Sequence, residues 1–459
     1  MKHLLSLAVV IGIFSSSAIL GESQNPTPQL PNITLWSRVT MGRVVSSQRE
    51  MQTYDYDFEG EWLENIDGGV KLTRQVTPTL LGRLNVGFTV NASRVRQATY
   101  ITVEQTAKVF SPALLDATMQ YTRSGVLGSA DNLTVELGYF PFKYNPQSTN
   151  LGEYLFRSNA YPGVIFSGFE NSNVDKPKIA GIHGAWGISP WVNIDAILNT
   201  ELDIFPLRDI NATAIATGAW PKIGSLAFGI EFAHLFVLDS SKTTPGLDKK
   251  YHPRLDQWVG YADPTTNDTT LYTFKGTKLM GRATLDIKGI IECLTGELPF
   301  FGKEDFKLYG EAAILGVKNY PGWYNKLNER IPAMAGFNVP AFHLLDVLSI
   351  EVEHYGSPYW NSQEFIWKSG SPVPYTGNNA GMWYNSWDDS LARTDDDVKW
   401  SIYASKKLST WLRLSGQVAC DHTPRNWYTA APPSYVKYTE MVPRTKKDWY
   451  FMLRTMFYF

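Results

Sequence analysis

The sequence predicts an all-β protein, a transmembrane antiparallel β-barrel of about 16 strands, with about 18 as the alternative. Three observations predict it: an N-terminal secretory signal, strand-length segments of alternating polarity, and an aromatic final strand. Composition agrees, because 14% of the 459 residues are aromatic, only 19% are charged, and the formal net charge is −2. Such a chain is too apolar to be disordered and lacks the basic excess of a nucleic-acid binder.

The first 21 residues are predicted to be a signal peptide. Lys2 and His3 precede an uncharged apolar run, 4–14, and small residues follow it at 15–18. The run is too short to span about 30 Å of hydrocarbon as a helix. Residues 22–34 are then a short periplasmic segment, and 35–459 form the barrel.

Segments of alternating polarity supply the strands. In the clearest one, 80–93, Leu84, Val86 and Phe88 share one face, and Arg83 and Asn85 lie on the other. A period of two is the signature of a β-strand. Alternation alone does not separate a soluble sandwich from a membrane barrel, since each has one apolar and one polar face.

Counting back from the C-terminus gives sixteen segments with this length and pattern. They are 448–459, 411–422, 397–407, 347–356, 331–341, 306–318, 270–290, 225–238, 210–220, 191–201, 178–188, 132–144, 113–124, 79–93, 57–76 and 35–46. The connections alternate between mostly short and mostly long, as in outer-membrane barrels. Segment 113–124 also suits a helix, and Pro332 and Pro340 weaken segment 331–341. Further strands within loops 239–269 and 357–396 would give the larger count.

The final strand decides between sandwich and barrel. Trp449, Phe451, Phe457 and Phe459 share one face, which suits lipid far better than water. This ending resembles the C-terminal strand of bacterial outer-membrane β-barrels of the porin type. The resemblance implies a Gram-negative outer membrane, lipid and lipopolysaccharide as surroundings, and insertion by the outer-membrane assembly machinery. It also implies a homotrimer, because porins form trimers.

The predicted inward faces carry charges of both signs. The basic residues are Arg83, Arg282, Lys399, Arg413 and Arg454, and the acidic ones are Glu136, Asp195, Glu231, Glu311, Glu351 and Glu353. Mixed charge fits a channel for passive diffusion of small hydrophilic solutes, whereas a strongly selective filter uses rings of one sign. The alternative is that many of these residues pair across strands and only support the wall.

Loop 145–177 is the predicted functional loop, because in general porins the third outer loop folds inward and narrows the channel. If this feature carries over, Glu153 and Arg157 supply opposed charges at the constriction. Tyr154, Phe156 and Tyr161 then pack the loop or line the path. The alternative is an ordinary helical pair, since Glu153 and Arg157 are spaced four apart.

Other readings remain open at this stage. Aromatic outer loops, at Tyr320, Trp323, Tyr324, Trp360, Phe365, Trp367, Trp383, Tyr384 and Trp387, suit either a saccharide-specific channel or an interfacial belt. A plugged barrel with a surface-binding or adhesion role is the other alternative. The acidic loop 388–397 lacks the spacing of a compact Ca²⁺ loop. No enzyme, catalytic residue, metal site or cofactor is predicted, because the sequence holds no serine-hydrolase elbow and no zinc-protease motif. A barrel enzyme stays open as a third alternative, since the sites of such enzymes assemble from several strands and leave no short motif.

Overall fold

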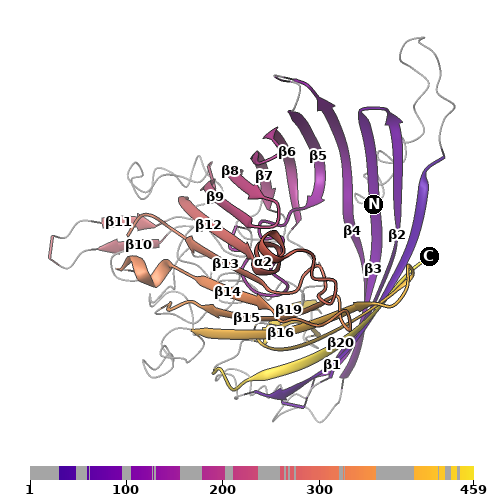
Figure 1. Ribbon diagram of the computed structural model, residues 1–459. Coiled ribbons are helices and arrows are strands. Elements are labelled where there is room, and N and C mark those ends of the chain that lie inside the picture. The colour runs from indigo at the N-terminus through magenta and orange to yellow at the C-terminus, as the bar shows by residue number, and fades with distance from the viewer. Residues whose placement is uncertain are drawn as a thin grey trace.

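The computed structural model describes 30–47, 59–60, 62–95, 105–126, 128, 131–155, 178–201, 210–235, 259–262, 265–266, 269–272, 275–319, 324, 326–357, 397–421, 423–428, 436–441 and 445–459. Within them, sixteen antiparallel strands form one closed barrel, which confirms the predicted fold class (Figure 1). The barrel strands are β1 (Asn32–Ser46), β2 (Trp62–Thr77), β3 (Leu80–Val95), β4 (Gln105–Ser124), β5 (Asn132–Pro141), β6 (Lys178–Ser189), β7 (Val192–Glu201), β8 (Asn211–Trp220), β9 (Gly224–Ala233), β12 (Gly276–Asp286), β13 (Lys307–Ile314), β14 (Ala333–Asn338), β15 (Val347–His354), β16 (Val398–Lys407), β17 (Leu412–Cys420) and β20 (Trp449–Tyr458).

The last strand closes the barrel, because β20 pairs with β17 on one side and with β1 on the other. Beyond β20, Leu35 and Phe459 exchange two backbone hydrogen bonds, at 3.1 and 2.8 Å. Closure leaves no free sheet edge, which is what a strand surrounded by lipid requires.

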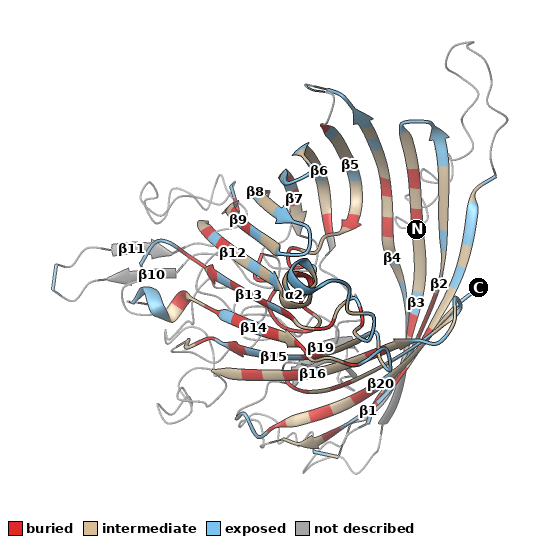
Figure 2. Ribbon diagram, viewed as in Figure 1, coloured by how far each residue is buried: buried red, intermediate tan, exposed pale blue. Residues whose placement is uncertain are grey.

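The alternation predicted from the sequence is visible in the burial pattern (Figure 2). On β15, Ile350 and Val352 are exposed on the outside, whereas Ser349, Glu351 and Glu353 are buried on the inside. The outer surface is therefore apolar over most of the described strands.

Two weak strand predictions are confirmed, since 113–124 lies in β4 and 331–341 contains β14. The prediction of a strand over 270–290 is wrong at its end, because α2 (Ile287–Thr295) follows β12 directly. The Asp286 side chain starts this helix by accepting a hydrogen bond from the Gly289 amide at 2.8 Å. Among the described residues, no helix is long and apolar enough to cross a membrane.

Among the described residues, the larger strand count is not observed. Two hairpins, β10–β11 (Val259–Ala262 and Thr269–Tyr272) and β18–β19 (Thr423–Tyr428 and Val436–Met441), form separate two-stranded sheets outside the barrel ladder. Most of loop 357–396 lies outside the described residues.

The barrel also contains an apolar core, which the expectation of polar inward faces did not include. Ile179, Ile197, Ile215 and Met280 point inward from β6, β7, β8 and β12 and are buried. They pack in one cluster with residues of the segment that follows β5. One side of the interior is therefore filled by packed side chains rather than lined only by polar groups.

Candidate functional site: a strap across the barrel

Residues 142–155 form a strap, the name used below for this segment, which leaves the end of β5 and crosses the inside of the barrel. It contacts β13 and β15 among other strands, and β15 lies eight places from β5 in the order of sixteen strands. In a closed barrel of this size that is the opposite wall. Tyr144, Leu151, Tyr154 and Leu155 are buried in the interior cluster.

Three wall carboxylates bind six consecutive backbone amides of the strap. Glu351 accepts from Thr149, Asn150 and Leu151 at 2.6, 2.9 and 2.8 Å. Glu353 accepts from Gly152 at 3.1 Å, and Glu311 accepts from the amides of residues 153 and 154 at 2.9 and 2.8 Å.

Side chains reinforce the same carboxylates. The Thr149 and Tyr309 hydroxyls donate to Glu351 at 2.9 and 2.8 Å, and the Tyr154 hydroxyl donates to Glu353 at 3.0 Å. Hydrogen bonds to an ionised acceptor are worth about 1.5–3 kcal/mol each, roughly twice a neutral bond. Hydrogen bonds to carboxylates on β13 and β15 thus fix the strap to the far wall.

The strap also folds upon itself around Glu153. The Glu153 carboxylate accepts from the amides of Tyr144 and Asn145 at 2.8 and 2.6 Å. Both Gly152 and Glu153 have left-handed backbones, with φ of 80° and 62°. A Cβ added at Gly152 would lie 2.9 Å from Glu311 Oε2, so only glycine fits here without movement.

Two further contacts tie the strap to other strands. Lys278, on β12, donates from Nζ to the Leu155 carbonyl at 2.6 Å and pairs with Glu231 at 3.4 Å. Asn150 donates from Nδ2 to Asp421, just after β17, at 2.6 Å, and the Tyr450 hydroxyl donates to the same carboxylate. The strap therefore connects β5 with β12, β13, β15 and the end of β17.

Tyr144, at the start of the strap, lies beneath Arg282 of β12, whose Cζ is 5.6 Å from the ring centroid. Burial, and next the charge of Glu311, raises the pKa of the Tyr144 phenol. The ring is thus a neutral partner for the guanidinium, which favours a cation–π contact.

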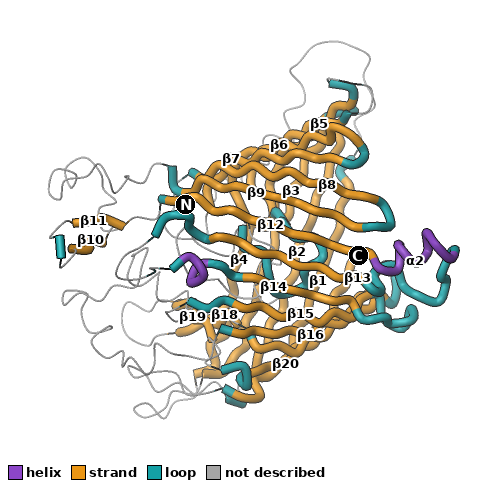
Figure 3. Tube along the Cα trace, turned by 60° about the vertical axis from the view of Figure 1, so that its left-hand side comes forward, coloured by secondary structure: helices purple, strands orange, loops and turns teal. Residues whose placement is uncertain are grey.

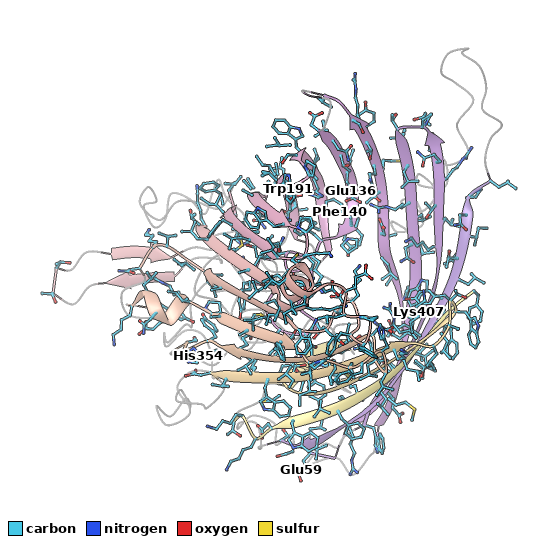
Figure 4. The ribbon with its side chains drawn as sticks, in the orientation of Figure 1. Glu59, Glu136, Phe140, Trp191, His354 and Lys407 are labelled. Atoms are coloured by element: carbon cyan, nitrogen blue, oxygen red, sulfur yellow. The ribbon has the colours of Figure 1, made fainter. Side chains whose placement is uncertain are left out.

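The wall formed by β3–β7 carries a different kind of cluster, in which side chains bind each other. Arg83 forms an ion pair with Glu136 and lies 3.8 Å from Asp116. His183 bonds Asp195 at 2.9 Å and lies 3.9 Å from Glu136. The Arg83 side chain is 26% exposed and that of Glu136 13%, so these groups still contact solvent. Glu136 is labelled in Figure 4.

The remaining predicted inward residues lie as follows. Lys399 is buried with its Nζ 3.7 Å from Glu353, Arg413 is exposed, and Arg454 is half-buried. Arg454 lines a small recess with Tyr403, Ser415, Gly416, Gln417 and Met452. In the final strand, Phe457 stacks on Trp411 and Phe459, with ring centroids 6.5 and 6.3 Å apart. Trp449 and Phe451 are half-buried on that strand.

Several predicted residues fall outside the described part of the chain. Phe156, Arg157 and Tyr161 are among them, as are residues 388–396 of the acidic loop and the loop aromatics other than Tyr324, which is buried. The residues that sequence reasoning missed include Asn150, Gly152, Lys278 and Asp421, and also Asp116, Thr149 and Tyr309. Among them Gly152 carries a local signal, because it is a glycine within a loop that is rich in aromatic residues.

The sequence matches no protein-family model and no curated protein. Among solved structures, a high-pH structure of Pseudomonas putida OprB aligns over 94% of both chains, with 10% identity and a TM-score of 0.47. A triple mutant of Rhodopseudomonas blastica porin aligns over 94% of this chain and 100% of its own, with 8% identity and a TM-score of 0.41. The shared feature is the barrel. Such distant likenesses carry no conclusion about activity.

Proposed function

We propose that this protein is a porin-like channel of the Gram-negative outer membrane, through which small hydrophilic solutes diffuse passively. The observation that carries the proposal is the closed sixteen-stranded barrel with an apolar exterior. Barrels of about 16–18 strands leave room for an aqueous path, whereas eight strands are filled by side chains. The strap crosses the interior of this barrel from β5 to β13 and β15, so a solute would pass beside it.

The wall of β3–β7 supports solute passage along that side. Arg83, Asp116, Glu136, His183 and Asp195 present both signs of charge and keep partial access to water. Polar solutes exchange hydrogen bonds with such a surface at little cost, because water already does so. Buried side chains fill the other side, around the strap, and give a solute no such partners.

A plugged barrel with a surface-binding role is the second candidate, and the interior apolar core favours it. Tyr154, Leu155 and Met334 pack against one another where an open channel would hold water. A saccharide-specific channel remains the finer alternative to general diffusion. Insertion by the assembly machinery, lipopolysaccharide contact and a homotrimer belong to the same proposal, on the porin resemblance of the final strand.

Planar-bilayer recording separates these candidates. Purified protein, shown to be folded by its heat-modifiable mobility, is reconstituted, and single-channel current is measured in KCl. Steady steps support a channel, and concentration-dependent block by an oligosaccharide identifies the saccharide-specific form. Folded protein that inserts and gives no steps contradicts the channel and leaves the plugged barrel.

A further inference from the structure

The short-turn end of the barrel carries an unusual apolar platform. It consists of α2, the following loop 296–306 and the next turn, 339–346. Figure 3 shows α2 projecting beyond the strand ends, at the same end of the barrel as the C-terminus. The exposed fractions are 82% for Leu294, 76% for Phe300 and 78% for Leu344. Ile291 and Phe342 are exposed as well.

Hydrogen bonds and a ring contact join the parts of the platform to one another. Lys288 donates from Nζ to the carbonyls of Phe301 and Gly302 at 2.9 and 3.1 Å, so the polar side of α2 is bound to its own loop. His343 bonds the Pro299 carbonyl at 2.9 Å and thereby joins the loop to the next turn. The rings of Phe301 and Phe342 lie 5.3 Å apart.

The platform is continuous with the apolar exterior of the barrel. Leu285 and Leu308 are exposed on the strands that enter and leave it, and Trp220 and Ile223 are exposed on the adjacent turn. The Asp286 amide donates to the Ile223 carbonyl at 2.8 Å, so α2 begins at the level of that turn. Exposed Trp191 and Trp411 mark the same level on either side.

The rim differs in apolar content from one turn to the next. The β2–β3 turn, Thr77-Pro78-Thr79, exposes no large apolar side chain of its own, and the described part of the β4–β5 turn exposes Val126. The platform instead gathers five large exposed apolar side chains on one helix and two neighbouring loops.

We propose that this platform docks on the phospholipid surface of the periplasmic leaflet, with the exposed apolar side chains of the amphipathic helix α2 and of the neighbouring loops entering the interface. Apolar side chains of such helices enter the headgroup and acyl boundary by about 5–10 Å, while polar groups remain in water. Lipid is the occupant because the platform extends a surface that already faces lipid. This inference rests on the proposed membrane placement of the barrel.

A site-specific fluorescent label tests the docking. Cys293→Ser removes the exposed thiol and leaves only buried Cys420. Single cysteines are then introduced as Leu294→Cys on α2, Phe228→Cys on the outer face of β9, and Thr79→Cys on the polar turn. Each is labelled with a nitrobenzoxadiazole dye and reconstituted in phosphatidylcholine–phosphatidylglycerol vesicles. Quenching is measured with aqueous iodide and with nitroxide-bearing lipids.

The docked platform gives a defined pattern. We expect the label at residue 294 to be quenched most by a nitroxide near the headgroup, and at least about twofold less by iodide than the label at residue 79. Full iodide access with no lipid quenching at residue 294 overturns the inference while residue 228 still reports the bilayer. Shielding from both quenchers means that a second copy or another protein covers the platform, which also overturns it. Loss of lipid quenching at residue 228 would instead contradict the membrane placement itself.

Discussion

The two inner walls of the barrel use the same residue types for different purposes. On β13 and β15, Glu311, Glu351 and Glu353 are buried and bind backbone amides of the strap. On β5 and β7, Glu136 and Asp195 keep contact with solvent and bind ionisable side chains. An inward-facing glutamate thus holds the backbone of the strap on one wall, whereas on the other wall it pairs with a charged side chain and faces water. The partner of the carboxylate determines which of the two roles it has.

The largest effect on stability is expected from Glu351→Gln, which disrupts the hydrogen bonds that attach the strap to β15. Five donors converge on this carboxylate, and a glutamine offers one oxygen while its own amide group opposes the other donors. We expect a loss of about 3–5 kcal/mol in the attachment of the strap. The temperature at which the heat-modifiable folded form disappears should fall.

Glu136→Gln is the matched control, because it makes the same change on the other wall. That variant should lower this temperature by less than Glu351→Gln does, because the Arg83–Glu136 pair still contacts solvent and such pairs contribute little to stability. An equal fall in this temperature for both variants would contradict the proposed difference between the two walls.

Gly152→Ala should weaken the strap by less, about 1–3 kcal/mol. Alanine is strained in the left-handed backbone conformation of this position, and its Cβ would lie 2.9 Å from Glu311 Oε2. Gly128→Ala is the control, since a Cβ there meets no atom within 4 Å. The same melting measurement applies, and equal values for the two alanine variants would show that the strap does not depend on this turn.

Glu136→Gln should have its own effect on ion preference. Removing one negative charge from the β3–β7 wall leaves Arg83 without its closest partner, so cation preference should fall. A charge about 10 Å away in water is worth about 0.4 kcal/mol, which is about a twofold change in local ion concentration. Reversal potentials across a KCl gradient measure it. Glu292→Gln, on α2 at the rim, should leave the potential unchanged.

The smallest effect is expected from Arg413→Ala. This side chain is exposed near the short-turn end and belongs to neither cluster. Its removal should change stability by about 0.5 kcal/mol or less and leave the conductance near that of the wild type. A large drop in conductance would place the narrowest part of the path at this end, away from the strap.

Periodicity in the sequence predicted the barrel well, because lipid and lumen impose opposite polarity on alternate residues. It placed Glu311, Glu351 and Glu353 on the inside, as observed. It did not predict what they bind, since the partners are main-chain amides about 160–200 residues away, as between Asn150 and Glu351. Every residue except proline carries an amide, so amides leave no signature in a sequence.

Two other features show where pattern reasoning stops. The sequence predicts a strand where α2 begins, because Ile287, Ile290 and Ile291 suit either structure. The interior apolar core was missed because Ile197 and Ile215 sit among polar inward residues, and only the strap gives them a partner. Both depend on contacts between segments distant in the sequence.

The central claim is that a channel runs past a strap locked to the far wall. Single-channel conductance of the wild type and Glu351→Gln, recorded side by side in KCl, tests it most directly. The account predicts steady steps from the wild type and larger, noisier steps from the variant, because the released strap no longer holds one position. Identical steps from both proteins would contradict a strap that borders the path, and folded wild-type protein without any steps would contradict the channel.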